Sequence, residues 1–234
     1  MTSRILIASL FAGTVAGFIA GLLQWQFVQP ILLHAELYEQ GILTHFNGSF
    51  SNTDVALERL QPVRDGLSIL FTMLLYIGYA LIVVALMSVR QMQGDTISPK
   101  TGIIWGIAGY VAFQFAPAVS LPPEVPGVAA ADVEIRQIWW FATVILTALG
   151  LWLISFSKQS ILMIGGALLI VAPHLVGAPE PEIFTGPAPT EIGALFAGRA
   201  LGIGLASWAL LGYFSALFLA QETIRSEHKS TETA

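Results

Sequence analysis

Histidine and carboxylate side chains are the residues of this chain with the chemistry to bind a metal ion. His34 and Glu36 stand two positions apart, and His174 precedes Glu180 in the stretch VAPHLVGAPEPE. Glu124 closes a second proline-rich stretch, FAPAVSLPPE. Imidazole and carboxylate ligands without a thiolate suit a borderline divalent cation such as Co²⁺, Ni²⁺ or Zn²⁺ better than Cu⁺. We therefore take His34, Glu36, Glu124, His174 and Glu180 as candidate metal ligands.

The spacing of these residues does not match a known resident metal site. Neither HxxxH nor HExxH occurs, and a lone histidine near a helix end is commonly an interfacial side chain. His45 is a weaker candidate of the same kind. The chain has no cysteine, no GxxxxGK[ST] loop and no GxSxG turn. We expect no enzymatic activity and no tightly bound cofactor.

The two proline-rich stretches share one pattern: Ala-Pro, five residues, then Pro-Glu. Pro117 and Pro173 fall in the last turn of apolar segments, where proline opens a carbonyl one turn back. In lipid such a carbonyl needs a protein or water partner, so two ends opened at one depth would form a polar mouth. The pattern is consistent with a duplicated helical hairpin, or simply with the tendency of prolines to end helices.

Membrane helices must position these side chains, because the chain is too apolar for a soluble domain. Its 234 residues are 55% hydrophobic and 11% charged, and the mean hydropathy is +0.74. Soluble domains are nearer to about 25% charged. We predict an all-α, polytopic bundle: a single transmembrane domain over residues 1–220 and a polar cytoplasmic tail over 221–234. The predicted spans are 5–28, 67–89, 101–120, 137–156, 160–176 and 193–220.

The distribution of charge predicts the orientation. With six spans both termini share one side, and that side carries more lysine and arginine near the spans, so we expect both termini in the cytoplasm. Most carboxylates then fall on the outer side, where an acidic rim would concentrate cations; ordinary solvated loops are the alternative. The net charge of −5 gives no indication of nucleic-acid binding.

Small residues and one arginine mark the helix interiors. GxxxG spacing, which permits close helix approach, occurs at Gly13, Gly17 and Gly21, at Gly102 and Gly106, and at Gly198 and Gly202. Arg199 is the one charge well inside a predicted span. It either faces the bundle and pairs with an acidic residue such as Glu191, or its helix begins late and the side chain snorkels outward.

Several segments together resemble the CbtA family of predicted cobalt transporter subunits. They are QWQFVQPILLHAELYE, FAPAVSLPPEVPGV, ADVEIRQIWW, APHLVGAPEPE and FAGRALGIGLASWALLGYFSALF, so the resemblance covers nearly the whole chain. It implies five or six spans in the bacterial inner membrane, a role in cobalt uptake for cobalamin synthesis, and a small single-span partner, CbtB. It supplies no ligand set, so the five candidate ligands rest on chemistry alone.

Two functions compete on this basis. The first is a subunit of a cobalt uptake transporter that captures the ion at the outer face. The second is a non-transporting accessory or assembly subunit of a larger membrane complex, because glycine faces in a nearly uncharged bundle also suit helix–helix contact. An intramembrane enzyme is the least supported.

Overall fold

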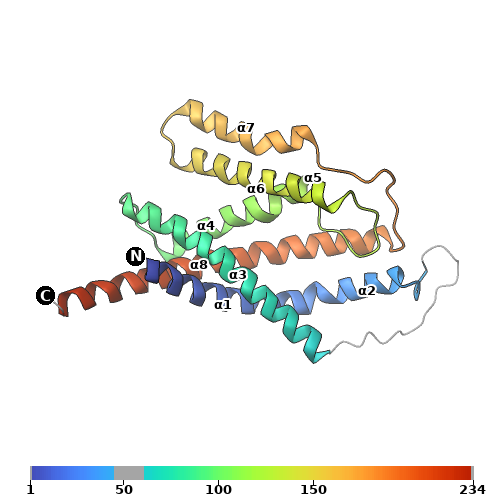
Figure 1. The fold of residues 1–234 in the computed structure, drawn as a ribbon, viewed down its shortest axis with the longest axis horizontal. Coiled ribbons are helices and arrows are strands. Elements are labelled where there is room, and N and C mark those ends of the chain that lie inside the picture. The colour runs from blue at the N-terminus through green and yellow to red at the C-terminus, as the bar shows by residue number, and fades with distance from the viewer. Residues whose placement is uncertain (1, 45–60, 233–234) are drawn as a thin grey trace. The chain divides into compact units, whose positions relative to one another are not determined.

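The computed structural model describes residues 2–44 and 61–232, and the side chains as far as residue 223 (Figure 1). Every regular element in these ranges is a helix, which confirms the predicted all-α fold. In chain order they are α1 (Thr2–Phe27), α2 (Gln29–Glu39), α3 (Pro62–Met92), α4 (Pro99–Tyr110), the π-helix η1 (Val111–Phe115), α5 (Ala116–Ser120), α6 (Val133–Phe156), α7 (Ser160–Val176) and α8 (Thr190–Glu232). His45 lies outside the described residues.

Five helical segments are long and apolar enough to cross a membrane, and a sixth is shorter. The long ones are α1, α3, the continuous segment Pro99–Ser120, α6, and α8 over Thr190–Thr223. The short one is α7, with 17 residues. The six predicted spans therefore all coincide with helices, and the protein is a multi-pass membrane protein. Beyond the sixth span α8 continues to Glu232, through most of the predicted polar tail.

The chain divides into two compact units. Unit 1 comprises Met1–Trp25, Leu60–Tyr110 and Ile203–Ala234, and unit 2 comprises Gln26–Arg59 and Val111–Gly202. All five candidate ligands belong to unit 2.

Glycines set the helix contacts of unit 1. A Cβ at Gly17 would lie 2.6 Å from the Cα of Met73 in α3, and one at Gly13 would collide with the backbone of Ile77. On α4, a Cβ at Gly106 would collide with the carbonyl of Trp208 in α8. These glycines are required because the helix backbones touch, as the GxxxG spacing predicts.

Candidate functional site

The two proline-rich motifs form matching helix ends in unit 2. Pro117 and Pro173 are both buried. Each stands three residues before its helix ends, at Ser120 in α5 and Val176 in α7. The next residue then donates to the proline carbonyl, Leu121 N to Pro117 O at 2.9 Å and Gly177 N to Pro173 O at 3.1 Å. The predicted helix ends are thus present, with the same final hydrogen bond.

The helices differ in the turn that leads to each proline. The residues before Pro117 form the π-helix η1, whereas α7 stays α-helical through Pro173. Proline has no N–H, so one carbonyl of the preceding turn lacks its intrahelical donor in both helices. A widened π turn is one way in which a helix accommodates such a break.

A side-chain hydrogen bond joins the two helix ends. Ser120 Oγ at the end of α5 lies 2.9 Å from His174 Nδ1 in α7. Trp139 of α6 adds a second contact, because its Nε1 donates to the carbonyl of Pro173 at 3.3 Å. The ring centroids of Trp139 and His174 are 6.0 Å apart with an edge-on geometry. Figure 1 shows α6 and α7 side by side over this length.

In one of its two tautomers, His174 would be able to bind a metal ion in this arrangement. The histidine is partly buried, and its Nδ1 is held by the Ser120 hydroxyl. When Nδ1 carries the proton and donates a hydrogen bond to Ser120 Oγ, the lone pair of Nε2 is available to a cation. Metal-binding histidines generally have their second ring nitrogen fixed by a hydrogen bond of this kind.

Glu124, in contrast, is engaged by a cation of the protein itself. Arg136 Nη2 of α6 donates to Glu124 Oε2 at 2.8 Å, and both side chains are about a quarter exposed. This ion pair ties the loop that follows α5 to the first turn of α6. A metal ion would have to compete with the guanidinium for this carboxylate.

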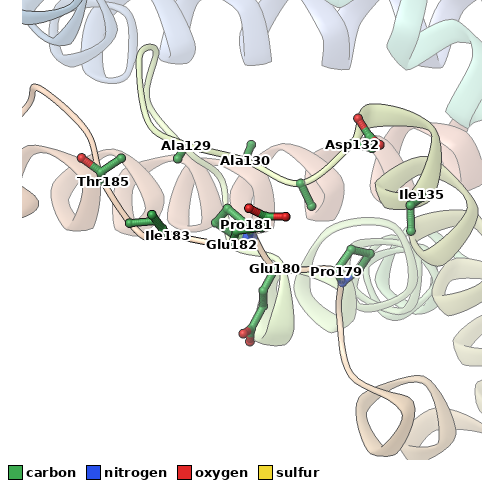
Figure 2. A pocket seen from close by; sticks show the side chains of 11 residues that line it. Ala129, Ala130, Asp132, Ile135, Pro179, Glu180, Pro181, Glu182, Ile183 and Thr185 are labelled. Atoms are coloured by element: carbon green, nitrogen blue, oxygen red, sulfur yellow. The ribbon is translucent and has the colours of Figure 1, made fainter.

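Glu180 lines an open groove of about 540 Å³ between the two proline-rich loops, residues 121–132 and 177–189. The loops are joined by a hydrogen bond from Ala129 N to Thr185 O at 2.8 Å. Glu182 and Asp132 line the same groove, but Figure 2 shows the three carboxylates apart, with Glu180 directed away from the other two. The groove therefore has acidic walls without a convergent set of ligands.

His34 and Glu36 both lie on α2. Side chains two positions apart on a helix leave it on different faces, so this pair cannot grip one ion together. The His34 ring packs instead against Tyr38, at a centroid distance of 5.6 Å. The end of α2 meets both proline-rich loops at Gly127, where an added Cβ would lie 3.2 Å from Glu39 Cβ and 3.0 Å from Pro187 Cγ.

No three histidine, cysteine, aspartate or glutamate side chains gather into a metal-binding group within the part of the chain that the structure describes. His174 and Glu124 each have a protein partner, and Glu180 points outward from the groove. The five-residue ligand set therefore remains a proposal, in which His174 has the best-prepared geometry.

Arg199 has a partner that the sequence analysis did not anticipate. Helix α8 begins at Thr190, so the alternative in which it begins late is wrong. Arg199 Nη1 donates to the carbonyl of Phe27, the last residue of α1, at 3.1 Å. That carbonyl lacks its usual donor because the N–H of Ile31 bonds to Val28 O. A cation beside carbonyls at a helix C-terminus is stabilising.

Sequence analysis missed Ser120 and Trp139 as parts of the site. Ser120 lies inside the first proline motif at the position that corresponds to Val176 in the second, so comparing the motifs gives no reason to select it. Trp139 lies in the predicted span 137–156, which was selected only for its apolar length. Its spacing of four from the buried Thr143, whose Oγ1 donates to the Trp139 carbonyl at 2.8 Å, was the available signal of a buried face.

Comparison with known proteins identifies the family. No curated protein and no solved structure matches the chain. A family model described as "Probable cobalt transporter subunit (CbtA)" matches residues 2–220, which is almost the whole chain. The protein therefore belongs to the CbtA family of probable cobalt transporter subunits.

Proposed function

We propose that this protein is the membrane subunit through which a cobalt uptake transporter captures Co²⁺ at the outer face of the bacterial cytoplasmic membrane. The observation that carries the proposal is the 2.9 Å contact between Ser120 Oγ and His174 Nδ1, which leaves Nε2 available to the ion when Nδ1 carries the proton. Family membership supports the cobalt assignment. The excess of lysine and arginine on the side of the termini supports an outward-facing site.

Capture would proceed by partial exchange of the ion's water shell. The carboxylates of the proline-rich loops raise the local cation concentration, and the hydrated ion meets His174 where α5 and α7 end. Glu180 and Glu124 supply further oxygen ligands, the latter by releasing Arg136. His34 and Glu36, on different faces of α2, then act in succession rather than as one chelate.

Uptake of labelled Co²⁺ by cells that depend on this chain tests the proposal. His174→Ala and the double variant His34→Ala with His174→Ala are compared with the wild type at equal membrane expression. We expect the half-saturating Co²⁺ concentration to rise in both, because an ion-contacting imidazole is lost. Gln137→Ala, at an exposed position near the start of α6, is the control. Unchanged uptake in the double variant would exclude this site.

An accessory role is the second candidate, and one observation favours it. Added Cβ atoms at Gly198 and Gly202 of α8 would meet nothing within 4 Å, so this GxxxG face packs against no described part of its own unit, unit 2. A helix of a partner subunit would fit such a face. Gly202→Leu is expected to abolish stoichiometric co-purification of a partner from native membranes. If co-purification persists, this face is not the partner contact. A separate test deletes the whole protein from cells: if the deletion changes no cobalt-dependent property, the accessory role is favoured over transport.

A further inference from the structure

The π-helix η1 lies within a membrane-spanning segment and ends two residues before Pro117, the buried proline of the first proline-rich stretch. It occupies Val111–Phe115 of the continuous span Pro99–Ser120. π-helical turns are rare and occur frequently at functional sites. The capture of an ion at His174 gives η1 no role, since the contacts of that site come from the ends of α5 and α7 and from α6.

This turn contains more hydrogen-bond acceptors than donors. Pro117 contributes no N–H, so one carbonyl of the turn before it has no intrahelical donor. Gln114 lies in the same turn, and its Oε1 is buried and accepts no hydrogen bond from the residues that the structure describes. The unpartnered Gln114 Oε1 therefore lies close along the chain to a backbone carbonyl that Pro117 deprives of its intrahelical donor, and oxygens of this kind need a partner in a membrane.

A second intramembrane glutamine shows what a structural role looks like. Gln24 in α1 accepts a hydrogen bond from Thr72 Oγ1 of α3 at 3.4 Å, which links two helices of unit 1. Gln114 makes no such link. A buried amide oxygen without a partner is destabilising, and its presence calls for a ligand that supplies positive charge or a proton.

We propose that Gln114 Oε1, with the carbonyl opened by Pro117, forms a second, oxygen-lined binding site for the transported divalent cation. The proposal rests on the proposed function. Gln114 precedes Ser120 by six residues, so at about 1.5 Å per residue it lies about 9 Å along the helix from the His174 site. Exposed backbone carbonyls at helix interruptions coordinate cations in other transporters.

Neutral oxygen ligands suit a site through which an ion passes. Gln114 lies in the continuous helical span Pro99–Ser120, and this span contains no aspartate or glutamate. Amide and carbonyl oxygens attract a divalent cation that retains part of its water shell, yet bind it weakly enough for release. The site thus resolves how a charged ion enters a bundle of such low charge.

Gln114→Met separates this role from a structural one, because methionine keeps the length of the side chain and removes the unpaired oxygen. We expect the maximal rate of Co²⁺ uptake to fall by about tenfold or more, the effect of losing a contact to a charged group. The half-saturating concentration is set at His174 and stays the same. Thermal stability of the protein, purified with its native partners, is expected to stay the same or to rise.

Gln24→Met is the matched control, and it gives the opposite pattern. We expect it to lower thermal stability while leaving the maximal rate per folded molecule unchanged. Gln114→Glu is a second variant of the site, expected to retain more labelled Co²⁺ through gel filtration because a carboxylate binds the ion more strongly.

The inference is overturned if Gln114→Met transports at the wild-type rate, or if it loses stability as Gln24→Met does. Failure of the proposed function looks different: the wild type would then show no cobalt-dependent uptake, whatever residue occupies position 114. Retention of Co²⁺ by Gln114→Glu at the wild-type level would also count against the site.

Discussion

Removing the hydroxyl of Ser120 tests whether the contact between the two helix ends serves metal capture. Ser120→Ala deletes the group that lies 2.9 Å from His174 Nδ1 and leaves the imidazole in place. The ring then keeps its edge contact with Trp139 but loses its hydrogen bond to the hydroxyl, which in the proposed site accepts from the Nδ1–H. Nε2 is free to carry the proton, and a protonated nitrogen cannot bind a cation.

The expected magnitude follows from the strength of one neutral hydrogen bond. Such a bond contributes about 0.5–1.5 kcal/mol, and about 1.4 kcal/mol corresponds to a tenfold change in affinity. The half-saturating Co²⁺ concentration for uptake is therefore expected to rise by about twofold to tenfold in Ser120→Ala. The maximal rate is retained because the ligand itself remains. Ser120→Thr keeps a hydroxyl and is expected to resemble the wild type.

Uptake is measured over a range of Co²⁺ concentrations in cells with equal membrane expression of each variant. Ser88→Ala is the control: Ser88 Oγ donates to the Val84 carbonyl at 2.8 Å within α3, so its loss removes a comparable bond elsewhere. The reasoning is refuted if Ser120→Ala leaves the half-saturating concentration unchanged while His174→Ala raises it. Equal effects of Ser120→Ala and Ser88→Ala would also refute it.

Three further predictions concern stability, measured as the thermal unfolding temperature of the purified protein in detergent. Gly106→Ala places a Cβ against the backbone of α8, and we expect it to lower the stability by about 1–3 kcal/mol. Gly78→Ala is the control, because its Cβ would meet nothing within 4 Å, and we expect it to gain up to about 1 kcal/mol in helix propensity. Equal effects of the two variants would contradict the close contact at Gly106. Arg199→Leu leaves the Phe27 carbonyl, the last of α1, without its 3.1 Å donor, and we expect it to lower the stability by about 1–3 kcal/mol. Arg199→Lys is expected to restore part of this loss. If Arg199→Leu leaves the stability unchanged, the bond is unimportant. Trp139→Phe removes the donor to the Pro173 carbonyl and is expected to cost about 1 kcal/mol, and no change would exclude that bond as a support of α7.

Local features of the sequence predicted most of the fold. Apolar length is a property of each segment alone, so all six spans could be located before their packing was known. The proline-ended helices were also predictable, because the missing N–H of Pro117 and Pro173 acts on their own helices. The GxxxG spacing within α1 likewise predicted a close helix contact, although the partner helix could not be named.

Contacts between distant segments could not be predicted in this way. Ser120 and His174 are 54 positions apart, and nothing in either type or spacing pairs them. A carboxylate such as Glu191 was one of two alternatives for Arg199, the other being outward snorkelling, and the structure gives it a carbonyl. That carbonyl is available because the N–H of Ile31 bonds to Val28 O instead, and its pairing with Arg199 appears only when these two segments of unit 2 are placed together.

The length of α7 explains why His174 needs a partner such as Ser120. Residues 157–159 alone join α6 to α7, so the end of α6 and the start of α7 lie at the same level. With 24 and 17 residues they extend about 36 Å and about 25 Å. The end of α7 therefore falls short of the start of α6, and His174 lies level with Trp139. If α6 spans a hydrocarbon core of about 30 Å, this level is at or just below the membrane surface. At this level Ser120 gives the His174 ring a hydrogen-bond partner within the protein, and with the proton on Nδ1 this partner would leave Nε2 for the ion of the proposed function.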